Sequence, residues 1–137
     1  MSSTRSAASV RRAAAFRVAL REFARETEQA TRESGLTPQR YLLLLLVKGA
    51  PNESEQTTVG ELCKRLYLAQ STVTELVSRA DQAGLVQVEQ SASDGRVSEI
   101  RLTGEGERKL AECFWRLEEE RNALREALSE QHAPAVL

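Results

Sequence analysis

Residues 57–106 read TTVGELCKRLYLAQSTVTELVSRADQAGLVQVEQSASDGRVSEIRLTGEG, and this stretch decides the fold. It opens on Thr58-Val59-Gly60-Glu61, which fits a capping box, where a Thr hydroxyl and a Glu carboxylate bond the free amides at a helix start. Apolar side chains then recur at the i, i+3, i+4 and i+7 spacing of one buried helix face, at Val59, Leu62, Cys63 and Leu66. The pattern predicts a short amphipathic helix.

A second helix is predicted after a turn at residues 67–69. Its buried face repeats the same spacing, with Val73, Leu76, Val77 and Ala80. A polar stripe on the opposite side consists of Ser71, Thr74, Glu75, Ser78 and Gln82. Gly84 is expected to end the helix, because glycine is common just past a helix C-terminus.

Two short alternating segments follow this glycine. Residues 85–90 and 97–102 alternate apolar with polar side chains on either side of a Ser-Ala-Ser-Asp-Gly tip, which predicts a β-hairpin. The order helix, turn, helix and hairpin predicts a winged helix-turn-helix.

Helices are also predicted ahead of this unit. Residues 9–33 contain no proline or glycine and are rich in Ala, Arg and Glu, so a long first helix is expected to stop at Gly35. Thr37-Pro38 then supplies a cap residue and a proline at the first helical position, which predicts a second, buried helix through residues 42–47. The polar segment 49–56 carries helix breakers and predicts an exposed loop.

A last helix is predicted from the cap residue Thr103 to about Ser129. Its apolar residues keep close to a heptad seam, at Leu110, Phe114, Leu117, Leu124 and Leu128. A small domain cannot cover such a seam alone, so we expect this helix and the first one to form the interface of a two-fold homodimer.

Length and composition limit the class of protein. The 137 residues suit one domain, expected to be mainly α with a small β-hairpin wing (α+β). The longest apolar run, residues 42–47, is far short of the roughly 20 residues that span a bilayer, and a soluble cytoplasmic protein without membrane contact is expected. The sequence shows no catalytic triad, metal-ligand cluster or glycine-rich phosphate loop, so neither an enzyme nor a cofactor is expected.

These elements, in this order, resemble the MarR family of bacterial transcription regulators from about Val10 to Ser129. The phrases that carry the resemblance are Val59-Gly60-Glu61-Leu62-Cys63, Ser71-Thr72-Val73-Thr74, Ala83-Gly84-Leu85-Val86, and Asp94-Gly95-Arg96 leading into Leu102-Thr103 and Gly106. The resemblance implies one domain over residues 1–137, with dimerisation helices at 9–35 and 103–129 and a winged-helix DNA-binding lobe at 37–102. It further implies a homodimer, most often a repressor, that binds a pseudo-palindromic operator and releases it when an effector changes the spacing of its recognition helices.

The resemblance also implies where DNA would be contacted. The second helix of the motif would enter the major groove, and Arg96, oriented by Asp94, would enter the flanking minor groove. The expected DNA-binding residues are Gln70, Ser71, Thr72, Thr74, Glu75, Ser78, Arg79, Asp94 and Arg96. Within this set, Ser78 and Arg79 are assigned to phosphates, and Ser71, Thr74 and Glu75 to base edges.

Three positions depart from the family's pattern. Ala69 stands where a capping serine is frequent, Glu75 where a basic or neutral residue is common, and Gln87 where arginine is frequent. A carboxylate at Glu75 would repel phosphate unless it accepts a hydrogen bond from cytosine N4. With a net charge of −1, the chain also shows only a faint form of the basic footprint usual for nucleic-acid binding.

Two other functions stay open. The weak positive charge allows a winged-helix module that binds protein rather than DNA. A thiol-based redox regulator is the second alternative, in which Cys63 is expected to be a buried structural thiol and Cys113 the redox candidate. Phe114 and Trp115 point in different directions on the last helix, and one is expected in the dimer seam while the other packs or lines a cleft for a small aromatic effector.

Overall fold

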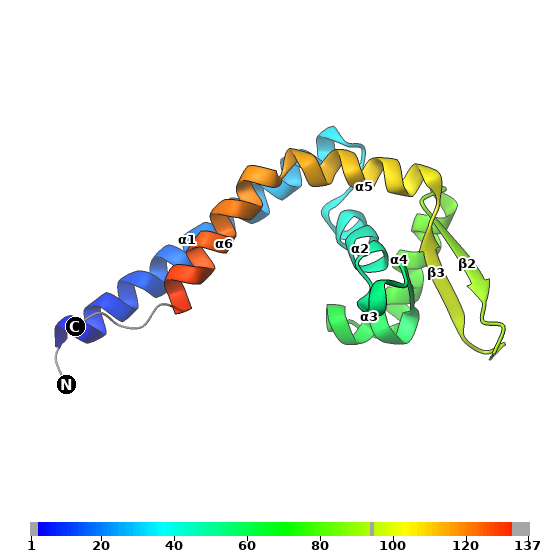
Figure 1. The fold of residues 1–137 in the computed structure, drawn as a ribbon, viewed down its shortest axis with the longest axis horizontal. Helices are drawn as coiled ribbons and strands as arrows, with labels where there is room; N and C mark the ends of the chain where they lie inside the picture. The colour runs from blue at the N-terminus through cyan, green and yellow to red at the C-terminus, as the bar shows by residue number, and fades with distance from the viewer. Residues whose placement is uncertain (1–2, 94, 133–137) are drawn as a thin grey trace. The chain divides into compact units, whose positions relative to one another are not determined.

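The structure, a computed structural model, describes residues 3–93 and 95–132. Its elements in chain order are α1 (Ser3–Glu33), α2 (Pro38–Lys48), the 3-10 turn η1 (Pro51–Glu53), β1 (Gln56–Thr58), α3 (Val59–Leu66), α4 (Gln70–Gln82), β2 (Val86–Gln90), β3 (Ser98–Leu102), α5 (Gly104–Arg116) and α6 (Glu118–His132) (Figure 1). The chain divides into two compact units. We call residues 31–113 the winged-helix unit, and residues 1–30 with 114–137 the helical unit.

The winged-helix unit is built on a three-stranded antiparallel sheet in the order β1-β3-β2. Ile100 at the centre of β3 faces Thr57 of β1 and Val88 of β2, and its side chain is fully buried. Other fully buried apolar side chains of this unit come from α2, α3, α4, β2 and α5, and they include Leu43, Leu44, Val47, Leu62, Val73, Ala80, Val86 and Cys113. The mainly α fold with a small sheet confirms the predicted fold class.

The predicted helix starts are present. Thr37 caps α2, where its side chain accepts a hydrogen bond from the Arg40 amide at 3.2 Å, and Pro38 is the first helical residue. Thr58 caps α3 in the same way through the Glu61 amide, also at 3.2 Å. These caps supply acceptors for amides that have no partner within the helix.

Two boundaries differ from prediction. Helix α1 begins at Ser3 rather than residue 9. Part of the predicted polar loop is a strand, because residues 56–58 form β1 and pair with Glu99–Arg101 of β3. This strand is stabilised by pairing with a distant strand, and its three residues show no local apolar alternation that predicts it.

The predicted continuous last helix is wrong. It divides at Leu117 into α5 and α6. Arg121 donates a hydrogen bond to the Phe114 carbonyl, and its guanidinium lies 3.5 Å from the centre of the Phe114 ring. Glu118, Glu119 and Glu120 fill the first turn of α6, where negative charge is favourable to the helix dipole.

Thr103 joins the end of α4 to the start of α5. Its hydroxyl donates to the Gly84 carbonyl at 2.6 Å and accepts from the Gly106 amide at 3.0 Å, while its own amide donates to the Leu85 carbonyl at 3.0 Å. Gly106 lies against the same segment so closely that an added Cβ would be 2.0 Å from the Leu85 oxygen. The base of the wing and the start of α5 are thus fixed to each other.

Lys48, at the end of α2, joins two other elements of the same unit. Its ammonium forms ion pairs with Glu107 of α5, at 2.8 Å, and with Glu55 of the loop before β1. Hydrogen bonds to Glu107 and then Glu55 raise the pKa of Lys48 above its ordinary value.

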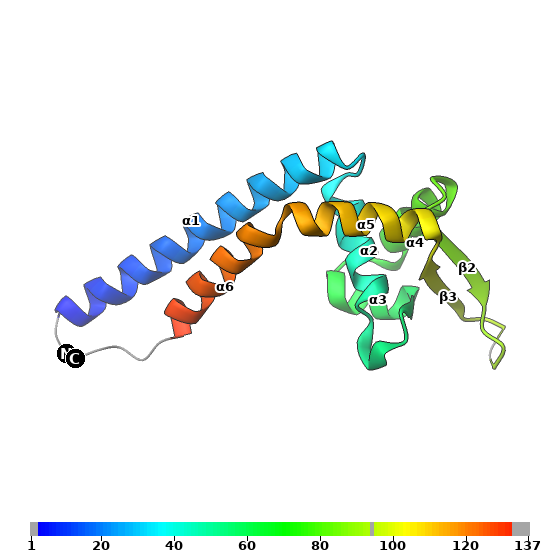
Figure 2. The same ribbon diagram turned by 45° about the horizontal axis from the view of Figure 1, so that its top comes forward.

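In the helical unit, α1 and α6 run side by side (Figure 2). A groove of about 420 Å³ lies between them, lined by Phe23, Leu124 and several charged side chains. Val10, Val18 and Leu128 expose large apolar side chains in this unit. Over residues 3–93 and 95–132, no helix is long and apolar enough to cross a membrane.

Candidate nucleic-acid interface

Helix α4 presents a broad polar face to solvent. Val73, Val77 and Ala80 are buried, as their spacing predicted. All seven α4 residues predicted to bind DNA are exposed, namely Gln70, Ser71, Thr72, Thr74, Glu75, Ser78 and Arg79. The helix starts without a side-chain cap, because Ala69 takes the extended cap conformation but offers no acceptor.

The wing supplies the other side of this surface. Strands β2 and β3 pair along their length, and a bond of 2.7 Å from the Ser91 amide to the Val97 carbonyl extends the ladder toward the tip. Arg96 is exposed just before β3. Asp94, expected to orient it, lies outside the described residues.

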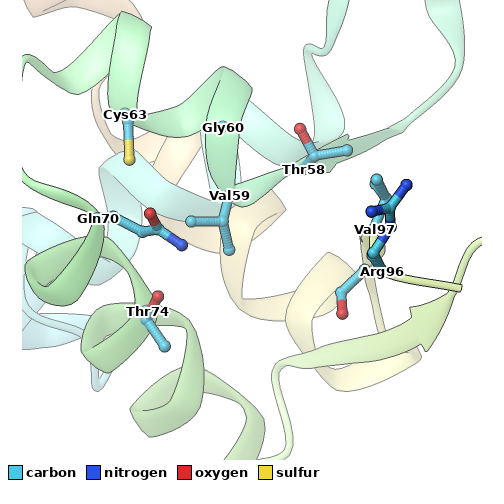
Figure 3. A pocket seen from close by; sticks show the side chains of 9 residues that line it. Thr58, Val59, Gly60, Cys63, Gln70, Thr74, Arg96 and Val97 are labelled. Carbon is cyan, nitrogen blue, oxygen red and sulfur yellow. The ribbon is translucent and has the colours of Figure 1, made fainter. Parts of the chain in front are cut away.

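A cleft of about 680 Å³ separates the wing from the two helices of the motif. Gln70 and Thr74 of α4 line one side, and Arg96, Val97 and Ser98 line the other (Figure 3). Its remaining wall is the start of α3, with Thr58, Val59, Gly60 and Cys63. The predicted helix residues and the predicted wing arginine therefore border one hollow.

A second, smaller hollow of about 150 Å³ lies along the other edge of α4. It is lined by Thr72, Glu75, Leu76 and Arg79, together with Gln39 from the first turn of α2. Glu75 and Arg79 form an ion pair of 2.6 Å here, from the guanidinium Nη2 to the carboxylate Oε1. Their side chains remain 62% and 63% exposed.

The charge of α4 is unusual for a helix that would enter a DNA groove. Arg79 is its one basic residue, and Glu75 and Asp81 are its acidic ones, so the helix carries a net charge of −1. This matches the faint basic footprint of the whole chain.

The burial of the two cysteines is the reverse of what their expected roles require. Cys63 is only half-buried and lines the cleft beside the wing, whereas Cys113 is fully buried. The expectation for Cys63 fails because α3 has only eight residues, and of its apolar face just Leu62 is completely covered. A redox role for Cys113 is opposed by this burial, since reactive thiols need access to solvent.

The adjacent aromatic residues of the last helix also separate. Trp115 is 62% exposed and meets Phe114 edge-on, with ring centres 5.1 Å apart. Phe114 is half-buried and carries the Arg121 guanidinium on its ring. Simple packing therefore describes Phe114, whereas the residues that the structure describes leave most of Trp115 exposed.

Sequence reasoning missed Gln39 and the start of α3 as parts of this surface. The residues around both positions predict only helix starts, because Thr37-Pro38 and the capping box at Thr58 account for the local sequence. Only the tertiary arrangement brings these helix starts alongside α4 and the wing.

Fold and surface together define a winged helix-turn-helix protein. Residues 34–97 match the model of the MarR family. Over this stretch the chain resembles the MarR family.

Particular relatives share stretches of sequence with this chain. The chain is 40% identical over 62 residues to the uncharacterized HTH-type transcriptional regulator YsmB of Bacillus subtilis, which is 45% of this chain and 42% of that protein. It is 33% identical over 86 residues to the organic hydroperoxide resistance transcriptional regulator of the same organism, covering 63% of this chain and 56% of that one. The chain thus spans about half the length of the curated relatives it matches.

A solved structure shows the same architecture. The transcriptional regulator MOSR of M. tuberculosis, determined in complex with DNA, superposes with a TM-score of 0.61 and 26% identity over 82% of this chain and 77% of that one.

Proposed function

We propose that this protein is a DNA-binding transcription regulator that acts as a homodimer on a pseudo-palindromic operator. The observation that carries the proposal is the exposed polar face of α4 bordered by a cleft with Arg96 on its far side. Relatives of this chain are named as transcriptional regulators, and MOSR was solved with DNA. A regulator of this kind acts where the chromosome lies, so the proposal includes the bacterial cytoplasm.

In the proposed complex, α4 of each subunit lies in the major groove and the wing reaches the neighbouring minor groove. Ser71 and Thr74 are short donors and acceptors suited to base edges, and Ser78 suits a phosphate. Arg96 is suited to a narrow A·T-rich minor groove, whose negative potential attracts an inserted arginine. Gln70 and Thr72, at the first turn of α4, complete the contact surface with Asp94.

The dimer is proposed to form through the helical unit. Val10, Val18, Trp115 and Leu128 expose large apolar side chains there, which is costly unless another surface covers them. A two-fold dimer places two copies of α4 on successive half-sites, as operator symmetry requires. Repression, released by a small aromatic effector that prefers one spacing of the two α4 helices, is the mode of regulation we propose.

The test is binding of the full chain to its own upstream DNA across a salt series. Wild-type binding is expected to weaken steeply with salt, because phosphate contacts release counterions. Arg96→Ala is expected to weaken binding by about tenfold or more, whereas Arg108→Ala, which removes the same charge from exposed α5, leaves it nearly unchanged. Equal effects of the two substitutions would refute the role of the wing.

Absence of any salt-dependent binding would favour the alternative, a winged-helix module for protein interaction. The net charge of −1 on α4 is the observation that supports this alternative. For the thiol-sensing alternative, a peroxide response that persists in Cys113→Ser would remove Cys113 from consideration.

A further inference from the structure

The ion pair between Glu75 and Arg79 lies on the face that α4 would present to DNA, along the edge that adjoins the first turn of α2. Both residues follow Ser71 along the exposed side, and their side chains are held together at 2.6 Å although each is more than half exposed. Glu75 lies four residues before Arg79, the arrangement in which an acidic and a basic side chain meet on one helix face. The two charged groups therefore already lie side by side on the helix before any DNA arrives.

The carboxylate restricts which bases can face it. An ionised Glu accepts hydrogen bonds and donates none. In the major groove, guanine presents N7 and O6 and thymine presents O4, which are all acceptors that would repel it. Adenine N6 is a donor, but it lies between two acceptors, its own N7 and the O4 of its partner. Cytosine N4 is the donor with an acceptor on one side only.

That neighbouring acceptor is O6 of the paired guanine, and Arg79 supplies the donors for it. A guanidinium is the usual partner of guanine O6 and N7. A C·G base pair thus offers a donor and an acceptor side by side, and the Glu75–Arg79 pair offers an acceptor and a donor side by side. This match rests on the proposed function, because it requires α4 to lie in the major groove.

We propose that Glu75 and Arg79 together read one C·G base pair in each half-site, with Glu75 accepting from cytosine N4 and Arg79 donating to the paired guanine. Glu75 is then the residue that determines specificity, because at an A·T pair the only donor, adenine N6, has an acceptor on each side that repels the carboxylate. Arg79 binds guanine and positions Glu75. This role for Arg79 replaces the phosphate contact that the family resemblance implies.

The net charge of −1 on α4 is consistent with recognition of a base pair by Glu75 and Arg79. A recognition helix without surplus positive charge gains little from phosphates of arbitrary sequence. Binding then depends on the base contacts, so discrimination rises as non-specific affinity falls.

The test is selection of bound duplexes from a random double-stranded DNA library by the full chain, followed by sequencing. Wild type is expected to enrich a two-fold symmetric motif with a C·G pair at one position in each half-site, favoured about tenfold or more over the other base pairs. Glu75→Gln keeps the shape of the side chain and removes its charge, and it is expected to lose that preference. Asp81→Asn removes the same charge from another exposed position of α4, and this variant is expected to retain the preference for C·G.

Arg79→Gln separates the two roles of the arginine. Loss of preference at the same position is expected if Arg79 reads guanine, whereas a phosphate contact alone would weaken all sequences equally and lower the salt slope. A motif that is the same in Glu75→Gln as in wild type would overturn the inference while leaving the proposed function intact. If wild type enriches no motif, the proposed function fails and this inference fails with it. Thermal unfolding by circular dichroism checks that each variant is folded.

Discussion

Gly106→Ala is expected to be among the most damaging single-methyl additions in this protein. The new Cβ would lie 2.0 Å from the Leu85 carbonyl oxygen, 3.0 Å from its carbon and 3.4 Å from its Cα. An ordinary contact between a Cβ and a carbonyl oxygen is longer than 2.0 Å by more than 1 Å. All three atoms belong to the main chain, so no side-chain rotation relieves the overlap. The start of α5 must move away from the end of α4.

Two effects contribute to the expected loss in free energy of unfolding. Overpacking by one methyl group typically costs about 1–3 kcal/mol, and a rigid backbone partner puts this site at the upper end. The displaced Leu85 carbonyl also accepts the Thr103 amide at 3.0 Å, a bond worth about 1 kcal/mol. We therefore expect Gly106→Ala to lower the free energy of unfolding by about 3–4 kcal/mol.

The assay is urea unfolding followed by circular dichroism at one fixed protein concentration, because the proposed dimerisation would make stability depend on concentration. Gly104→Ala is the matched control, since it adds the same methyl group two residues earlier, where no described atom outside the local helix backbone lies within 4 Å. The control is expected to be neutral or more stable by up to about 1 kcal/mol. A loss below about 1 kcal/mol for Gly106→Ala, or equal losses in both variants, would refute the steric argument.

Three further substitutions test other local features of the winged-helix unit. Ala69→Ser is expected to stabilise the protein by about 1 kcal/mol, because Ala69 already has cap geometry without an acceptor; an unchanged melting temperature would contradict this. Tyr67→Gly is expected to stabilise by up to about 1 kcal/mol, since Tyr67 is 93% exposed at φ 56°, where glycine carries no Cβ penalty, and urea unfolding measures the difference. Lys48→Met is expected to cost up to about 1 kcal/mol near pH 8, because the paired Lys48 is half exposed. Because the pKa of Lys48 is raised in the folded state, its ion pairs stabilise the folded protein fully below the ordinary value of 10.5. The difference in stability between Lys48→Met and wild type should therefore vanish as pH rises through the folded pKa. A difference that does not depend on pH would exclude the ion pairs as its cause.

Local signals were enough to predict most of the winged-helix unit. Thr37-Pro38 and Thr58 mark helix starts through bonds to amides within three residues, so the information lies in the sequence itself. Gly35 and Gly84 have φ values of 73° and 76°, which favour glycine, and both stand where helix ends were predicted. The hairpin matches its prediction to within one residue at each strand.

The features that sequence reasoning missed depend on distant partners. Strand β1 exists because residues 56–58 pair with β3, more than forty positions away. The break at Leu117 has no glycine or proline nearby and is accompanied by the contact of Arg121 with Phe114. The Glu75–Arg79 spacing was visible in the sequence, but only the structure shows that the pair forms on the open face of α4.

Trp115 gives the protein an optical reporter of its own. It is the sole tryptophan of the chain, and its ring is 62% exposed in the helical unit. Indole emission shifts to the blue and resists quenching by iodide when water is removed from the ring. If a second subunit covers this surface, a dilution series of unlabelled protein will display the dissociation of the dimer as a red shift. The spectrum of the native chain then measures subunit affinity without a dye or a tag.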